Sequence, residues 1–114
     1  MIYIIEDDEL MAECIARACK KETKIFSNVY DAISELNNNL PELIFLDILL
    51  SGPDGFTFLN EIASYEDTFN IPIVIVSSLD FSHQNLDIYN VVGKINKDTM
   101  TPKEVKEYVE RYTH

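Results

Sequence analysis

Two apolar segments of the chain end in aspartates. Residues 2–6 read Ile-Tyr-Ile-Ile-Glu and are followed by Asp7 and Asp8, while residues 43–46 read Leu-Ile-Phe-Leu and are followed by Asp47. Ionised carboxylates avoid the protein interior unless a partner compensates their charge. Three carboxylates held close together raise one another's pKa, and a divalent cation relieves that repulsion. The pattern therefore predicts a cation pocket, and Mg²⁺ suits it because this ion prefers oxygen ligands.

Two further polar residues follow apolar segments. Ser77 ends the run Pro-Ile-Val-Ile-Val-Ser, and Lys97 follows residues 93–96. A hydroxyl donor and a compact positive charge are both useful where negative charge builds up on a transferring phosphoryl group. A carboxylate can itself be the nucleophile, which gives an aspartyl phosphate. Ser78 and Lys94 are rival candidates for the same two roles, and only geometry decides between them.

The segments that must position these residues alternate between strand and helix patterns. The expected strands are residues 2–6, 24–27, 43–47, 72–77 and 93–96. The expected helices are residues 9–22, 29–38, 56–65 and 82–92, and a last helix that starts at Thr101-Pro102 with an N-cap, a proline and a capping-box glutamate. In the first of these helices, the expected inward stripe is Met11, Cys14, Ile15 and Ala18.

Five strands alternating with five helices predict an α/β fold in which a doubly wound parallel sheet has helices on both faces. Ligands of such sheets bind beyond the carboxyl ends of the strands, which is where the polar residues above fall. The length of 114 residues fits one domain that spans 1–114.

Composition excludes several classes of function. The net charge of −11 argues against binding to nucleic acid or to anionic membrane surfaces. No apolar run approaches the roughly 18 residues of a membrane span, and the N-terminus lacks the pattern of a signal peptide. Cys14 and Cys19 stand at a spacing that does not favour a disulfide between them. We therefore expect a cytoplasmic protein.

The polar residues at the strand ends, in this order, resemble the receiver domains of two-component response regulators over residues 1–112. The resemblance rests on the acidic pair after the first strand, on Asp47 with Gly55 eight residues later, and on Ser77 and Lys97. It implies a flavodoxin-like fold with strand order 2-1-3-4-5. It also implies a signalling switch, not an enzyme that acts on an external substrate.

The resemblance assigns roles to the acidic residues. Asp47 would accept a phosphoryl group from a phosphohistidine on a sensor histidine kinase or a histidine phosphotransfer protein. Asp8 and Asp47 would bind Mg²⁺ directly, together with the backbone carbonyl of Leu49, and Asp7 would bind it through water. The output partner, or an attached effector domain, is left unidentified.

The same resemblance assigns roles around the phosphoryl group. Ser77 and Lys97 would contact its oxygens. Leu49 and Leu79 occupy the two positions that tune the lifetime of the phosphoryl group in this family. Neither side chain can hydrogen-bond to an attacking water, so slow self-dephosphorylation is expected.

The chain departs from the family pattern at several positions. Ser51 stands where a proline is usual, with Pro53 displaced, and Asp98 replaces the proline that usually follows the lysine. Lys94 replaces the usual aromatic residue, and the segment between the serine and the lysine is shorter than usual. The alternative hypothesis is therefore a degenerate receiver that binds other proteins without being phosphorylated.

A third hypothesis is a Mg²⁺-dependent phosphatase with an aspartate nucleophile. Such enzymes place a second acid two residues after the nucleophile, and Leu49 stands there instead. Glycine occurs only at positions 52, 55 and 93, so no Gly-rich nucleotide-binding loop can be written either.

Overall fold

The structure is a computed structural model of the whole chain, and it describes residues 1–48, 55–78 and 88–114. Leu49 and Leu79 lie outside these residues, as does most of the helix expected over 82–92. Within the described residues, no helix has both the length and the apolar character that crossing a bilayer requires.

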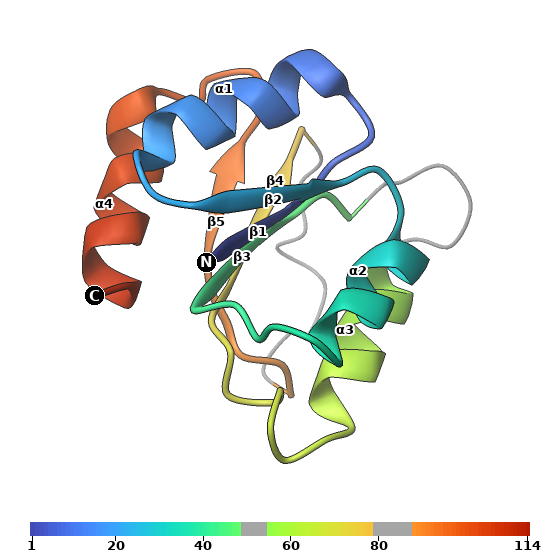
Figure 1. Cartoon of the computed structure of the whole chain (residues 1–114). Helices are drawn as coiled ribbons and strands as arrows, with labels where there is room; N and C mark the ends of the chain where they lie inside the picture. The colour runs from blue at the N-terminus through green and yellow to red at the C-terminus, as the bar shows by residue number, and fades with distance from the viewer. Residues whose placement is uncertain (49–54, 79–87) are drawn as a thin grey trace.

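Five parallel strands form the sheet, which confirms the predicted fold. In space they follow the order β2-β1-β3-β4-β5, as Figure 1 shows. Their bounds are β1 Ile2–Ile5, β2 Thr23–Phe26, β3 Leu43–Leu46, β4 Ile73–Ser77 and β5 Val91–Asn96. In β1, Ile5 pairs with Phe26 on one side and with Leu46 on the other. The residues that follow Ile5 and Leu46 therefore leave the sheet side by side.

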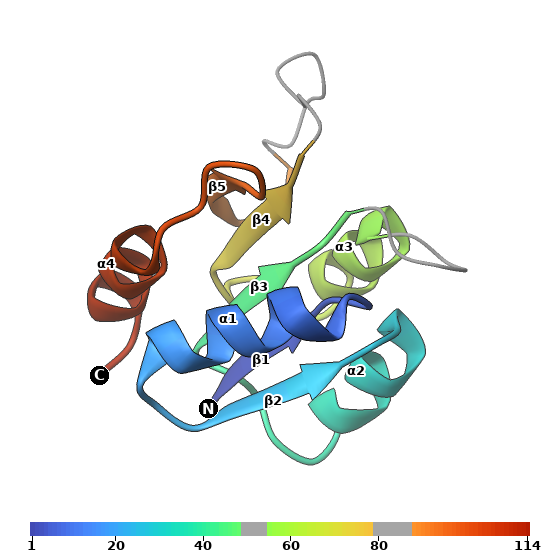
Figure 2. The same ribbon diagram turned by 90° about the horizontal axis from the view of Figure 1, so that it is seen from above.

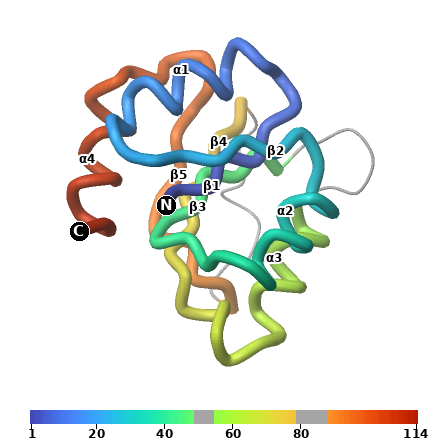
Figure 3. Tube along the Cα trace, in the orientation of Figure 1, coloured from blue at the N-terminus to red at the C-terminus, as the bar shows by residue number. Residues whose placement is uncertain are grey.

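Four helices are described, and they cover the two faces of the sheet in pairs. Their bounds are α1 Glu9–Cys19, α2 Val29–Leu36, α3 Gly55–Ala63 and α4 Pro102–Tyr112. Figure 2 shows α1 and α4 on one side of the sheet and α2 and α3 on the other. The trace in Figure 3 follows the chain from β1 through α1 to β2 and from β2 through α2 to β3. The capping box expected at Thr101 is present at the start of α4.

The central strands are buried on both faces because helices cover each side. In β1, Ile2 and Ile4 pack with α1 and α4, whereas Tyr3 and Ile5 pack with α2 and α3. All four are 0% exposed. A strand in this setting has no solvent face, which explains why its sequence is an unbroken apolar run and not an alternating pattern.

Helix α1 differs from the prediction in its end and in its buried face. It ends at Cys19 instead of residue 22 because Lys20 takes a left-handed backbone conformation, with φ of 53°. Cys14 is exposed and Met11 is only partly buried. The buried residues are Ala12, Ile15, Ala18 and Cys19. The prediction for Cys14 was wrong because the buried stripe is rotated toward small residues that fit closely against the sheet.

Strand β5 begins two residues earlier than expected, at Val91, and takes the last two residues of the helix predicted over 82–92. Its pairing with β4 shifts at this point, since Ile73 pairs with Val91 but Val74 pairs with Gly93. A bulge of this kind adds one residue to a strand. Gly93 stands at this shift, and an isolated glycine within a strand often marks a bulge.

Candidate functional site

Three carboxylates meet where β1 and β3 end. Glu6 follows β1 directly and is 2% exposed, and Asp47 follows β3 directly and is 4% exposed. The backbone N–H of Asp47 donates to the carbonyl of Ile5 at 2.9 Å, which joins the two strand ends. Asp7, which is exposed, completes the group, and one carboxylate oxygen from each of the three residues lies within 4.8 Å of the others. We call Glu6, Asp7 and Asp47 the acidic cluster.

Lys97 reaches the acidic cluster from the end of β5. Its Nζ lies 3.0 Å from Asp47 Oδ2 and donates to Glu6 Oε1 at 3.1 Å. It is also 2.9 Å from Glu6 Oε2, which is close enough for an ion pair. That oxygen is buried and has no aligned hydrogen-bond donor. One ammonium group therefore contacts two of the three carboxylates, and a net negative charge remains at the site.

Asp8 has a different place from the one predicted for it. Its Oδ1 accepts hydrogen bonds from the backbone N–H groups of Leu10 at 3.0 Å and Met11 at 3.3 Å, so Asp8 is the N-cap of α1. The side chain is exposed, and the acidic cluster contains Glu6 in its stead. Asp8 therefore lies outside the acidic cluster, and Glu6 stands within it. The physical reason is the register, since Ile5 aligns with Leu46 and the next residues are Glu6 and Asp47.

The sequence held a signal for Glu6 that the prediction missed. Glu6 follows the last buried residue of its strand just as Asp47 follows Leu46. A count from the end of each apolar run, instead of a search for aspartates, would have paired these two residues.

The structure also distinguishes the rival polar residues. Ser77 is the last residue of β4 and is buried, whereas Ser78 is exposed. Lys97 donates its backbone N–H to the carbonyl of Ser77 at 3.1 Å, so these two strand ends are joined as well. Lys94 is exposed on β5. Asp98 follows Lys97 through a trans peptide bond, and its N–H donates to Asn96 Oδ1 at 2.8 Å.

The electrostatics of the site follow from burial and from the shared lysine. Burial raises the pKa of Glu6 to about 7, against the opposing effect of the hydrogen bond from Lys97. Burial by itself would lower the pKa of Lys97, but the hydrogen bonds to Glu6 and Asp47 outweigh it and the pKa is raised. Because folding raises the pKa of Glu6, its contribution to stability is present at low pH and is lost as the pH rises through about 7.

The donor set of the acidic cluster fits a hard divalent cation. All three groups offer carboxylate oxygens, which Mg²⁺ prefers. The buried Glu6 Oε2 without an aligned donor has unused acceptor capacity. A cation would also reduce the excess of negative charge that Lys97 leaves uncompensated.

Gly55, the first residue of α3, lies against the backbone of Asp47 and Ile48. Its N–H donates to the carbonyl of Ile48 at 2.8 Å. A Cβ at this position would lie 2.8 Å from the Ile48 Cα and 3.0 Å from the backbone oxygen of Asp47. Only glycine allows such a close approach at this point.

Comparison with known proteins identifies the family. The model of the response regulator receiver domain matches residues 2–110. The chain belongs to this family. Among relatives of this receiver domain, the transcriptional regulatory protein BaeR of Escherichia coli O6:H1 is 31% identical over 80 residues, which are 68% of this chain and 32% of BaeR. The response regulator PleD of Caulobacter vibrioides is 28% identical over 82 residues, 69% of this chain and 18% of PleD.

Solved structures show the same fold. The receiver domain of a sensor histidine kinase from Pseudomonas aeruginosa PAO1 superimposes with a TM-score of 0.81 at 18% identity, covering 97% of this receiver domain and 94% of that chain. Its crystal structure has a magnesium ion coordinated in the active site cleft. The receiver domain described here spans a third or less of the length of PleD and BaeR.

Proposed function

We propose that residues 1–114 form one receiver domain in which Asp47 accepts a phosphoryl group in a Mg²⁺-dependent reaction. The donor would be a phosphohistidine on a sensor histidine kinase or a histidine phosphotransfer protein. The observation that carries this proposal is the buried Asp47 carboxylate, held between the ammonium group of Lys97 and the other two acids of the cluster. Membership of the receiver family supports it.

The transfer exchanges one bond to phosphorus for another. A carboxylate oxygen of Asp47 forms a bond to phosphorus while the bond between phosphorus and the histidine nitrogen breaks. The bonding electrons stay on the imidazole nitrogen. Lys97 already lies 3.0 Å from Asp47 and would neutralise charge on the phosphoryl oxygens. Ser77, at the end of the adjacent strand, would donate its hydroxyl to the same oxygens.

Glu6, Asp7 and Asp47 are the residues that would hold Mg²⁺. The backbone carbonyl of Leu49, which lies outside the described residues, would be a further ligand. When bound, the ion supplies positive charge that offsets the carboxylates and the incoming phosphoryl oxygens. The magnesium ion in the cleft of the kinase receiver domain with the same fold supports Mg²⁺ as the bound ion. The protein would then promote only its own phosphorylation and dephosphorylation.

Incubation with Mg²⁺ and acetyl phosphate, followed by intact mass measurement, tests the proposal. The wild-type chain should gain one phosphoryl group. Chelation of Mg²⁺ and the substitution Asp47→Ala should each abolish the gain, because one removes the cation and the other removes the nucleophile. Asp8→Asn is the matched control, since Asp8 caps α1 outside the acidic cluster and phosphorylation should persist.

The alternative is a degenerate receiver that binds partners without being phosphorylated. Lys94 and Asp98, which depart from the family pattern, are the observations in its favour. In the experiment above, a wild-type chain that stays at its original mass would support this alternative and contradict transfer to Asp47.

The lifetime of the phosphoryl group gives a separate prediction. Leu49 and Leu79 offer no group that orients an attacking water, so self-dephosphorylation should be slow. Leu49→Asn and Leu79→Glu should each shorten the half-life by about tenfold, since a positioned polar group assists attack by water. The decay of the phosphorylated mass with time measures this. Unchanged half-lives in both variants would contradict the assigned role of these positions.

A further inference from the structure

A slot lies between α2 and α3, away from the acidic cluster. Helices that connect parallel strands run back across the sheet, so the carboxyl ends of α2 and α3 lie at the end opposite to the strand carboxyl ends (Figure 1). The slot has a volume of about 280 Å³. It shares no residue with the acidic cluster.

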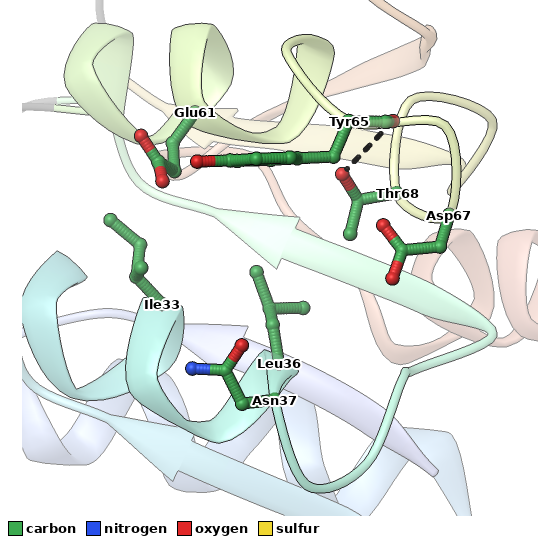
Figure 4. Close-up of a pocket in the computed structure, with 7 residues that line it drawn as sticks. All are labelled: Ile33, Leu36, Asn37, Glu61, Tyr65, Asp67 and Thr68. Carbon is green, nitrogen blue, oxygen red and sulfur yellow. Dashed lines mark hydrogen bonds between the residues drawn. The ribbon is translucent and has the colours of Figure 1, made fainter.

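The walls of the slot are apolar and aromatic. Figure 4 shows Ile33 and Leu36 rising from α2 toward the ring of Tyr65, which lies across the opposite side. Tyr65 is 55% exposed, so one face of its ring is available to a ligand. An aliphatic floor beneath an aromatic ring fits a flat group that can stack.

The backbone of Tyr65 is held in place by the turn that follows α3. The carbonyl of Tyr65 accepts hydrogen bonds from the N–H groups of Thr68 at 3.2 Å and Phe69 at 3.0 Å. The buried hydroxyl of Thr68 donates to the carbonyl of Ile62 at 2.6 Å. This turn is therefore fixed to the end of α3, which sets the backbone position from which the Tyr65 ring projects.

The charge of the slot favours a cation. Glu61 and Asp67 line it, and none of the nine lysines and arginines, all of which lie in described residues, does so. Both α2 and α3 end beside the slot without a basic residue in the last turn. In contrast, α1 has Arg17 and α4 has Arg111 at that position. The carboxyl end of a helix carries partial negative charge, so the two helix ends add to the negative potential of the slot.

We propose that this slot binds an arginine side chain on a basic segment of a partner protein. A planar guanidinium stacks on an aromatic ring while its N–H groups reach carboxylates on either side, which a compact ammonium cannot do as well. The net charge of −11 would also steer basic partners toward the chain. The slot needs no phosphoryl group, so this proposal stands or fails independently of phosphorylation at Asp47.

A second copy of the chain is a weaker candidate for the occupant. The Arg17 side chain is 81% exposed and is the kind of group that would fit. Self-association, however, would bring together two chains of net charge −11. A partner of opposite charge avoids this repulsion.

The test uses the full chain without phosphodonor and an NMR titration with the peptide acetyl-Gly-Arg-Gly-amide. The control peptide carries citrulline, a neutral isostere of arginine. Amide shifts should concentrate in residues 33–37 and 61–68, and the citrulline peptide should produce none. Shifts that centre on the acidic cluster, or equal binding of the citrulline peptide, would overturn the proposal.

Matched variants distinguish binding of the arginine peptide in the slot from a general attraction of the peptide to this acidic chain. Asp67→Asn should weaken the binding of the arginine peptide roughly tenfold, and Tyr65→Leu should weaken it roughly threefold. Glu66→Gln and Tyr30→Leu remove the same groups at exposed positions outside the slot and should leave binding unchanged. Sedimentation of the wild type should show a monomer. A dimer that Tyr65→Leu dissociates would assign the slot to a second copy and contradict the partner proposal.

Discussion

Replacing Lys97 with methionine should lower the free energy of unfolding by about 2–4 kcal/mol at pH 8. The substitution keeps an aliphatic chain but removes the ammonium group that contacts Glu6 and Asp47, which are 2% and 4% exposed. Two buried carboxylates would then face each other without a cation. The loss falls below that of a fully buried pair because the Lys97 side chain is 20% exposed. Urea unfolding measures the change.

Lys94→Met on the same strand is the control for this prediction. Lys94 is exposed, so its removal should change the unfolding free energy by less than about 0.5 kcal/mol. At pH 8, Glu6 is largely ionised in the wild type, where burial raises its pKa to about 7 while Lys97 lowers it. Equal losses in the two variants would show that Lys97 does not compensate the acidic cluster.

The second large effect is expected at Gly55. Gly55→Ala should destabilise the fold by about 1–3 kcal/mol, although alanine is ordinarily the better residue in a helix. The added Cβ would lie 2.8 Å from the Ile48 Cα and 3.0 Å from the Asp47 carbonyl oxygen, and backbone atoms cannot move aside cheaply. Asp47 must shift with them. We therefore also expect slower phosphorylation by acetyl phosphate, measured by intact mass over time.

Gly93→Ala is the matched control, because the added Cβ would meet atoms of a side chain instead of backbone atoms. A Cβ there would lie 2.1 Å from the hydroxyl oxygen of Tyr108. The Cζ and Cε1 atoms of Tyr108 would lie at 2.4 and 2.5 Å, so the Tyr108 ring must move, but Tyr108 is not part of the acidic cluster. Gly93→Ala should therefore leave phosphorylation at the wild-type rate. Slowing in both variants alike would mean that the Gly55 contact does not set the position of Asp47.

Sequence reasoning succeeded where long apolar runs and terminal signals decide the structure. The run from Leu43 to Leu46 has no polar residue, and the structure buries it on both faces of the sheet. The capping box at Thr101 marks the start of α4 because its side chains satisfy backbone groups locally. These features depend on neighbours in the chain, so the order of residues is sufficient to predict them.

Sequence reasoning failed where distant segments set the outcome. The exposure of Cys14 follows from how α1 packs against the sheet and α4. The start of β5 at Val91 follows from a bulge in its pairing with β4. Periodicity within one segment carries no information about such partners.

By itself the sequence determined that acids and a lysine end the strands of a parallel α/β fold, because apolar runs and their polar ends are local properties. Only the tertiary structure decided which of them meet. The register of β1 against β3 sets Glu6 beside Asp47, and the first turn of α1 engages Asp8. Lys97, rather than Lys94, reaches the acids because β5 presents only the former at its carboxyl end. Strand register is a property of pairs of segments, and no single segment encodes it.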